Sequence, residues 1–418
     1  MIAVITPLHE PHQQYWQEAY QSLKEQVDQN WLWYVSSPFR EGVPSWLKRD
    51  KRVRWIQNKS TSIGALKRVL CQEAAKDIVV ELDDDDVLDP LALHEVRKAL
   101  ESKDKVFAYS NSASFNTTTY QSTEYPNKYG WHKRLTQFRG HTLTEMVAFP
   151  PSAHMIRRVF WAPNHIRAWK ADAYWTVGGH DGSLAVGDDH DLCCRFYLRY
   201  GASGFNHIDK CLYYYREHPK NTVKLLNDAI QRQCNANYVR YIEELAQRWS
   251  RDNGLQMYDL GGGVSPRAGY ISVDRGEKAD LCHVDLNFYW PFGDSSVGVF
   301  RASHLLEHLK DPIHTMNEAY RCLAPGGWFL IEVPSTDGRG AFQDPTHVSF
   351  WNSNSFWYYT DPMYARFIPE YKGKFQISHL EDVQLPNNII VTYAHLIALK
   401  PPYDERFVGE NKWLPSTT

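Results

Sequence analysis

Short apolar runs alternate with amphipathic segments along this chain of 418 residues, and this alternation most restricts how the chain can fold. Each apolar run has the length and composition of a strand, and the segments between them have the spacing of helices that bury one face. Strands that alternate with helices form parallel sheets covered by helices, so we predict an α/β fold. Because a single hydrophobic core rarely exceeds about 250–300 residues, we expect two domains.

The first half contains five predicted strands, three short predicted helices and one long one. The strands are IAVITP, WLWYV, VRWIQ, DIVVELD and KVFAYS, and the helices span Tyr15 to Gln26, Ile63 to Ala75, Pro90 to Glu101 and Val223 to Trp249. The polar segment SRDNG ends the long helix, and a second α/β pattern begins at Leu255. We therefore place the boundary near residues 245–255 and predict domains at 1–245 and 246–418.

Charge, cysteines and hydropathy exclude several classes of protein. A net charge of −3 excludes a polyanion binder that acts through bulk charge. The seven cysteines have neither zinc-site spacing nor the pattern of a small disulfide framework, which favours a reducing cytoplasm. The N-terminus lacks the pattern of a signal peptide, and we expect no transmembrane segment. The oligomeric state stays open.

Four adjacent carboxylates follow the strand DIVVE, in the run LDDDDVLDP from Leu82 to Pro90. Neighbouring carboxylates repel one another unless a cation compensates them. Mn²⁺ and Mg²⁺ bind carboxylate oxygens together with phosphates, so an ion here could neutralise a diphosphate leaving group. The alternative is a solvated acidic turn at the start of the next helix.

The stretch SIGALKRVLCQEAAKDIVVELDDDDVLDPLAL resembles family 2 glycosyltransferases of the GT-A fold, in which a strand ends in a D-x-D-D motif. The resemblance implies that Asp83 contacts the nucleotide ribose or the metal and that Asp85 ligates the metal, with Asp86 after them. It also places Thr6 and Pro7 where binding of a nucleotide-sugar donor begins. Ser36 and Ser37 stand where many members carry the acidic residue that reads uracil, so the donor base and sugar stay open.

The segment WKADAYWTVGGHDGSLAVGDDHDLCCRFYLRYG is similar to the family segment in which a glycine turn precedes an acidic pair and a helix. Gly178 and Gly179 match the turn, and Asp188 and Asp189 match the pair. Inverting transfer needs a carboxylate that takes the proton of the acceptor hydroxyl. We predict Asp189 as this base and Asp188 as an orienting residue; the alternative is that both only cap the helix.

A third element, YYYREHPKNT, resembles the family segment whose histidine closes over the metal or the diphosphate. The resemblance assigns this position to His218 as a metal ligand, with Arg216 near the donor phosphate. A structural histidine is the alternative.

Lys128 to Lys170 is rich in basic and aromatic residues. Such a mixture suits an anionic acceptor, such as a phosphate-bearing glycan or lipid or a nucleic acid, and the alternative is a solvated loop that contacts only the donor diphosphate. The basic residues are Lys128, Lys133, Arg134, Arg139, Arg157, Arg158, Arg167 and Lys170, and the aromatic residues are Trp131, Phe138, Phe160, Trp161 and Trp169.

The second half contains YDLGGGVSPRAGYISVDRG, a strand, a glycine loop and a strand that ends in an acid. Residues 255–340 resemble class I S-adenosylmethionine (SAM)-dependent methyltransferases, which have a Rossmann-like fold. The resemblance implies that Asp259, Gly261 and Gly263 line the methionine and ribose side, that Asp274 binds the ribose, and that Asp285 lies near the adenine. The loop between Gly263 and Tyr270 leaves little room for a first crossover helix.

Two further segments of this half resemble parts of the same family. The segment HLLEHL is expected at the mouth of the site, and RGAFQDPTHVSFWNSNSFWYY is expected to shape an acceptor pocket. The residues concerned are His304, Glu307 and His308 in the first segment, and Gln343, Asp344, His347 and Trp351 in the second.

The leading hypothesis is a metal-dependent inverting glycosyltransferase with a C-terminal SAM-dependent methyltransferase domain. It would act on a surface glycan or a lipid-linked acceptor in a bacterial or phage context. One alternative is a phage enzyme that glycosylates a hydroxymethylated DNA base. Another is a carbohydrate- or nucleotide-binding scaffold without activity.

Overall fold

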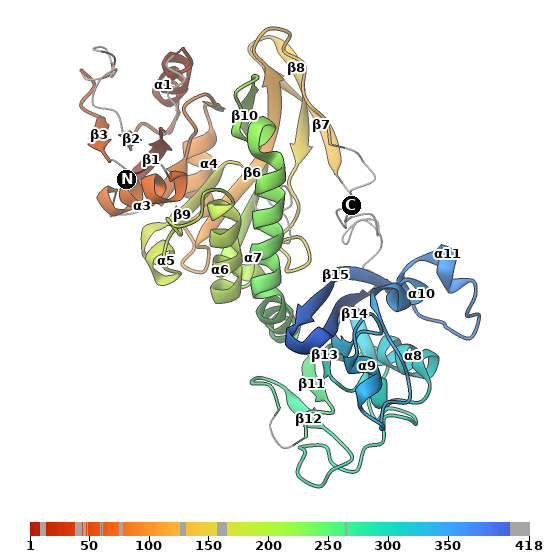
Figure 1. The fold of residues 1–418 in the computed structure, drawn as a ribbon. Coiled ribbons are helices and arrows are strands. Elements are labelled where there is room, and N and C mark those ends of the chain that lie inside the picture. The colour runs from red at the N-terminus through yellow and green to blue at the C-terminus, as the bar shows by residue number, and fades with distance from the viewer. Residues whose placement is uncertain are drawn as a thin grey trace. The chain divides into compact units, whose positions relative to one another are not determined.

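The computed structural model divides into two compact units, Met1–Tyr241 and Ile242–Thr418 (Figure 1). The structure describes residues 1–8, 14–37, 44, 47, 49–58, 60, 62–74, 78–125, 131–156, 165–263 and 266–401. Each unit is built around its own sheet and its own hydrophobic core.

The sheet of the first unit has the strand order β3-β2-β1-β4-β9-β6-β10-β5, and the hairpin of β7 and β8 pairs with β6. Its first four strands are parallel, whereas β9 is antiparallel to β4 and β6, and β5 is antiparallel to β10. The strands are β1 (Ile2–Pro7), β2 (Trp31–Ser37), β3 (Val53–Gln57), β4 (Ile78–Glu81), β5 (Val87–Leu88), β6 (Phe107–Asn116), β7 (His132–Phe138), β8 (His141–Val147), β9 (Arg167–Lys170) and β10 (Phe205–Glu217).

The helices of this unit follow local sequence signals. In α3, the Ser62 hydroxyl accepts a hydrogen bond from the Ala65 amide at the N-terminus, where such caps satisfy free amides. The first turn of α6 carries three aspartates, which favour the positive end of the helix dipole. The helices are α1 (Trp16–Lys24), α3 (Ile63–Glu73), α4 (Ala92–Ala99), α5 (Ala171–Thr176), α6 (Asp188–Tyr200) and α7 (Thr222–Asp252), with a 3₁₀ turn η2 at Ala202–Gly204.

The sheet of the second unit has the order β12-β11-β13-β14-β16-β15. Strands β12, β11, β13 and β14 are parallel, and β16 pairs antiparallel with β14 and β15. The described residues between β11 and β12 form no helix, as the short loop predicts. The strands are β11 (Gln256–Leu260), β12 (Ile271–Val273), β13 (Val297–Ser303), β14 (Leu323–Pro334), β15 (Phe375–Leu385) and β16 (Ile389–Ala398).

The helices of the second unit are mostly short. In α8 the Asp311 carboxylate accepts hydrogen bonds from the amides of Ile313 and His314, and Pro312 occupies the first turn, so this helix starts with both common N-terminal signals. The helices are α8 (Pro312–Cys322), α9 (Gly340–Gln343), α10 (Trp357–Thr360) and α11 (Pro362–Ala365), with 3₁₀ turns η3 (Leu306–His308), η4 (Ser353–Phe356) and η5 (Pro386–Asn388).

The predicted α/β class is confirmed in both units, although both sheets are mixed and neither is purely parallel. All seven cysteines are free thiols. No described helix combines the length and the apolar composition that crossing a membrane requires.

Candidate functional site

The acidic run of the first unit lies where its strand order reverses. From β1 the chain continues to β2 and β3 on one side and returns to β4 on the other, so β1 and β4 are neighbours with parallel carboxyl ends. In open α/β sheets, ligands bind at such a reversal, outside the carboxyl ends of the strands. Asp83 to Asp86 follow β4, and Thr6 and Pro7 end β1, so both predicted sets lie at this edge.

Asp85 and His218 come together although 133 residues separate them. Strand β10 ends beside the acidic run, and His218 Nε2 lies 2.8 Å from Asp85 Oδ2. The Lys220 amide donates to His218 Nδ1, so in the neutral ring Nε2 carries the proton and donates it to the carboxylate. Of the predicted metal ligands, these two therefore form a pair.

This pair has the spacing of two ligands of a hard divalent ion, and binding one would require the ring to move its proton from Nε2 to Nδ1 and give up the Lys220 contact. Neighbouring ligands of an octahedral Mg²⁺ ion with bonds of about 2.0–2.1 Å lie about 2.9 Å apart, close to the observed separation. Asp83, the third predicted ligand, does not join them: among the described residues, the three do not come within 4.8 Å of one another. The remaining positions of an ion held by Asp85 and His218 would fall to water and to a diphosphate.

Arg216 is buried next to the acidic run and hydrogen-bonds two of its residues. Its guanidinium Nε donates to the Asp85 carbonyl at 2.6 Å, and its amide donates to Asp86 Oδ1 at 2.7 Å. The guanidinium also lies 3.1 Å from Glu18 and packs on the ring of Tyr15. Arg216 therefore positions the ligand loop, and its predicted contact with donor phosphate would require it to leave these partners.

A buried group of charges adjoins the acidic run. Glu81, the last residue of β4, accepts a hydrogen bond from Arg167 Nε at 2.7 Å and lies 3.1 Å from Lys67 Nζ. All three side chains are buried, and they come from β4, β9 and α3. An isolated buried charge is costly, so each of these charges depends on its partners.

The second acidic pair joins the same group from the first turn of α6. Asp188 Oδ2 lies 3.6 Å from Lys67 Nζ and 3.7 Å from His180 Nε2, and Arg167 Nη1 donates to Asp189 Oδ2 at 2.6 Å. Gly64 permits this approach of α3, because a Cβ there would lie 2.7 Å from the Asp181 carbonyl. The two acidic elements, about a hundred residues apart, thus meet through Lys67 and Arg167.

The two acidic elements differ in proton affinity. Burial raises the pKa of Asp83 to about 7, the Asp85 and Glu81 carboxylates add to the rise, and Lys67 opposes it. Burial acts in the same direction on Asp189, but the charges of Arg167 and Lys67 hold its pKa well below its usual range. Asp189 therefore stays ionised, and it hydrogen-bonds strongly but is a weak base.

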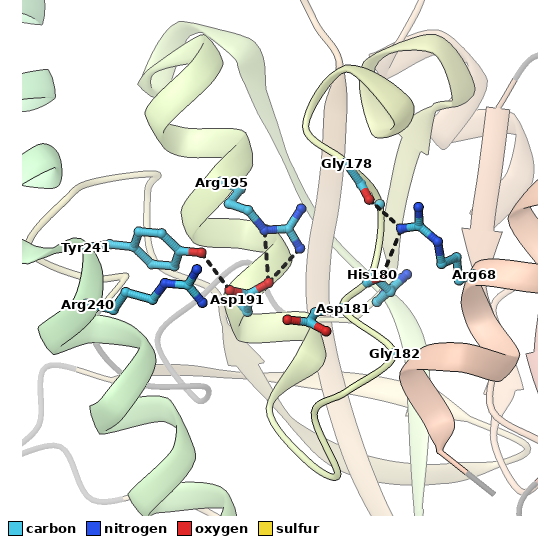
Figure 2. A pocket seen from close by; sticks show the side chains of 10 residues that line it. Arg68, Gly178, His180, Asp181, Gly182, Asp191, Arg195, Arg240 and Tyr241 are labelled. Atoms are coloured by element: carbon cyan, nitrogen blue, oxygen red, sulfur yellow. Dashed lines mark hydrogen bonds and ion pairs between the residues drawn. The ribbon is translucent and has the colours of Figure 1, made fainter. Parts of the chain in front are cut away.

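A charged pocket of about 340 Å³ lies on the other side of the predicted glycine turn (Figure 2). Arg68 donates to the carbonyls of Gly178 and His180, and Asp191 is held by Arg195 and by the Tyr241 hydroxyl. These contacts fix the loop that carries the buried ring of His180 toward Glu81, 3.4 Å away. The contacts around this pocket therefore position His180 beside Glu81.

Thr6 is fully buried, and its hydroxyl is already engaged. It donates to the Leu82 carbonyl at 2.6 Å and accepts from Trp33 Nε1 at 2.8 Å. The side chain therefore ties the end of β1 to the acidic run. A donor contact at this position would come from the backbone or from Pro7, which is partly exposed.

The structure gives no support for the expected anion-binding surface between residues 128 and 170, because in the described residues its cations contact acidic side chains or carbonyl oxygens. Arg134 pairs with Glu145 and Asp209, Lys133 with Glu124, Arg139 with Glu18, and Lys170 donates to the Ser102 carbonyl. Trp131, Phe138 and Trp169 are buried and offer no stacking face. Lys128, Arg157, Arg158, Phe160 and Trp161 lie outside the described residues.

A buried histidine next to the acidic pair makes stability depend on pH. Burial lowers the pKa of His190 to about 4, against the charge of Asp189. Below pH 6.5 the imidazole of His190 becomes protonated in the unfolded chain but stays neutral in the folded unit. The free energy of unfolding therefore falls as the pH decreases toward 4. We expect His190 to lower the free energy of unfolding of the first unit by about 2 kcal/mol between pH 7 and pH 5.

Pulse proteolysis in urea, read by mass spectrometry of peptides from the first unit, measures this loss. The His190→Gln variant should lose about 2 kcal/mol less than the unmodified chain over the same interval. The exposed His132→Gln variant is the control and should keep the full loss. An unchanged pH dependence in His190→Gln would contradict the assignment.

In the second unit, the glycine loop after β11 also lies at a reversal of strand order. The chain passes from β11 to β12 on one side and then to β13 on the other. Gly261 and Gly263 have left-handed φ angles of 72° and 53°, and a Cβ on Gly261 would lie 3.0 Å from Leu305. The buried Asp259 accepts hydrogen bonds from the Arg267 amide and from Arg301, so its side chain closes the loop.

The two predicted ribose and adenine residues follow at the same edge. Asp274 comes directly after β12, where a carboxylate can accept hydrogen bonds from ribose hydroxyls. Its Oδ1 accepts from the Gly276 amide, and no other described residue is seen to hydrogen-bond this carboxylate. Asp285 accepts from the amide and side chain of Asn287, and these bonds lower its pKa.

The segment from His304 to His308 follows β13 and also reaches this edge. His304 lies 3.4 Å from Glu307 and 3.6 Å from Glu332, and hydrogen bonds to both raise its pKa to about 9. Of the residues expected around an acceptor pocket, Gln343 and Asp344 are exposed, and His347 approaches His308. Trp351 is buried and donates to Ser349, so it is a core residue.

Comparison with protein families finds similarity in the C-terminal part of the chain. A family model described as a methyltransferase domain matches residues 225–375. The C-terminal part of this chain is therefore similar to methyltransferase domains. A probable SAM-dependent methyltransferase of Mycolicibacterium smegmatis is 29% identical over 153 residues, which are 34% of this chain and 54% of that protein. The chain therefore spans about half the length of this curated relative.

Solved structures with similarity to the chain include S. aureus TarS. Its 1–349 fragment matches 60% of this chain and 73% of the fragment, with 15% identity and a TM-score of 0.40. The same fragment in complex with UDP-GlcNAc matches 60% of this chain and 78% of the fragment, with 14% identity and a TM-score of 0.40.

Sequence reasoning missed the residues that join the two acidic elements: Lys67, Glu81 and His180 were not predicted as site residues, and Arg167 was assigned to a surface. One signal was available. Glu81 is a charged residue at the end of an apolar strand, and such a residue needs a buried cation.

Proposed function

We propose that the first unit is a metal-dependent inverting glycosyltransferase that uses a nucleotide-sugar donor and a hydroxyl acceptor. One observation supports this most: Asp83–Asp86 and Asp188–Asp189 adjoin a shared group of buried charges at the reversal of strand order. Asp85 and His218 would hold Mn²⁺ or Mg²⁺, which would neutralise the departing diphosphate. The acceptor would be a glycan or a lipid-linked sugar.

Asp189 is the carboxylate we assign to the acceptor hydroxyl. Its side chain is 18% exposed, against 7% for Asp188, which Lys67 and His180 surround. Because Arg167 weakens the basicity of Asp189, this carboxylate would orient the hydroxyl first and take the proton late, as the bond to the anomeric carbon forms. Asp188 would hold Lys67 in place.

We expect Asp189→Asn to lower kcat about 10²–10⁴-fold, because general bases contribute rate factors of this size. The KM for the donor should change little. Nucleotide release from UDP- and GDP-sugars with Mn²⁺ and a panel of glycan acceptors measures both constants.

Asp191→Asn is the matched control for this experiment. It alters an aspartate in the same helical turn, and because the asparagine amide can still hydrogen-bond Arg195 and the Tyr241 hydroxyl, kcat should stay within a few-fold of the unmodified value. A kcat unaffected by Asp189→Asn would remove Asp189 from the mechanism.

We further propose that the second unit binds SAM and methylates the sugar just added or its acceptor. The glycine loop, Asp274 and the matched family support this proposal. Asp274→Ala should weaken SAM binding about 10–100-fold, since hydrogen bonds to a charged group contribute about 1.5–3 kcal/mol each.

Isothermal titration with SAM tests this expectation. The exposed Glu277→Ala in the same loop is the control and should bind as the unmodified chain does. If the unmodified chain shows no heat of binding, the assignment of a methyl donor to this unit is lost.

A further inference from the structure

Three side chains in the second unit converge as metal ligands do. Glu307, His308 and His347 each offer a ligand atom, and these atoms lie within 4.8 Å of one another. They are the one such trio of histidine, cysteine and acidic side chains that the described part of the chain contains. Two imidazoles and one carboxylate are a common set for Zn²⁺ or Fe²⁺ in sites that keep open positions.

The carboxylate of this trio, that of Glu307, is buried, and the described residues satisfy only part of its hydrogen-bonding capacity. Glu307 is 2% exposed, and one of its oxygens, Oε2, has no hydrogen-bond partner among the described residues. Its other oxygen lies 3.4 Å from His304. A buried carboxylate oxygen that lacks a partner is costly, and a bound cation would remove that cost.

Both imidazoles present the nitrogen that a metal needs. His347 Nδ1 lies 2.8 Å from the Ala341 carbonyl, and His308 Nδ1 lies 3.3 Å from the Thr346 carbonyl. A carbonyl only accepts, so each Nδ1 carries the proton, and each Nε2 is left with a lone pair. Histidines that bind metals commonly donate their other nitrogen to a carbonyl in this way.

The backbone holds the three side chains together. The amides of Val348 and Ser349 donate to the Glu307 carbonyl at 2.8 and 3.0 Å, which fastens the loop of His347 to the turn that carries Glu307 and His308. Ligands of tetrahedral Zn²⁺ lie about 3.4 Å apart, so small side-chain rotations would close the trio around an ion.

We propose that Glu307, His308 and His347 form a binding site for a divalent transition-metal ion. The turn that carries Glu307 follows β13, and Leu305 in the same turn packs against Gly261 of the glycine loop. The ion would therefore lie at the edge of the sheet where the methyl donor is proposed to bind, and its open positions suit an acceptor oxygen.

Zn²⁺ titration of the full chain, stripped of metal with a chelator, tests the site. All proteins carry Asp85→Asn, so that the pair in the first unit does not contribute. We expect about one equivalent of Zn²⁺ to bind, and Glu307→Gln, His308→Ala or His347→Ala to weaken binding more than about 100-fold, since loss of outer contacts alone costs 10–100-fold. His314→Ala is the control, because its ring faces the Phe288 carbonyl outside the trio.

A second measurement needs no substitution in the trio. Zn²⁺ should protect His308 and His347 from acylation by diethyl pyrocarbonate, while His314 reacts as before, and peptide mass spectrometry distinguishes them. Stoichiometric binding that all three variants retain, absence of binding, or unprotected histidines would each overturn the proposal. Neither result depends on sugar transfer, so failure here is distinct from failure of the proposed glycosyltransferase.

Discussion

Asp85→Asn should strongly reduce metal-dependent sugar transfer while the first unit stays folded. The substitution keeps the shape of the side chain but removes the charge that faces His218 Nε2 at 2.8 Å. If the ion contributes several kcal/mol to stabilising the departing diphosphate, kcat/KM should fall about 10³-fold, equivalent to about 4 kcal/mol. Nucleotide release with increasing Mn²⁺ measures this loss, and added Mn²⁺ should not restore the rate.

The run of four aspartates supplies the control for this experiment. Asp84 accepts a hydrogen bond from Trp16 Nε1 on helix α1, so Asp84→Asn keeps an acceptor at the same place. It should retain Mn²⁺ dependence and most of the activity. If both variants lost activity equally, the run of aspartates would act through folding alone. If both variants kept their activity and Mn²⁺ dependence, Asp85 would not be a metal ligand.

Lys67→Met should destabilise the first unit by about 3–5 kcal/mol, because removing one partner of a buried ion pair leaves the others uncompensated. Lys67 Nζ lies between Glu81 and Asp188, at 3.1 Å from the first carboxylate and 3.6 Å from the second. Hydrogen exchange read by mass spectrometry separates the two units, and the loss should be confined to peptides from the first.

A second substitution checks the cause of this loss. Glu81→Gln in the Lys67→Met background removes the carboxylate that lost its Lys67 partner, and it should recover part of the free energy of unfolding. The exposed Lys98→Met is the control and should change stability by less than about 0.5 kcal/mol. A change of that small size in Lys67→Met would show that the group of buried charges does not hold the site together.

The residues that resemblance predicted and those it missed differ in a physical way. Asp85 and His218 lie in the segments that follow β4 and β10, and a motif that follows a strand can be recognised from its own segment. Arg167 became a site residue only because β9 pairs with β4, which brings its guanidinium beside Glu81. Strand order is a property of the whole sheet, so no local pattern assigns that pairing.

The same limit explains the basic segment between residues 128 and 170. Some of its cations looked available because their partners are distant in the chain: Arg139 pairs with Glu18, and Arg134 pairs with Asp209 as well as with the nearby Glu145. Counting charges within the segment could not anticipate this neutralisation. The observed pairing weakens the alternative of a DNA acceptor, because duplex binding needs free cations that displace counterions.

Helix α7 belongs to both units, and this limits how the chain can be cut. Tyr241 holds Asp191 in the first unit, while two residues later Glu243 pairs with Arg267 in the second. A truncation at the boundary would expose a helix end and remove one of these anchors. Fragments for separate expression should therefore overlap, so that each retains Thr222–Asp252 in full.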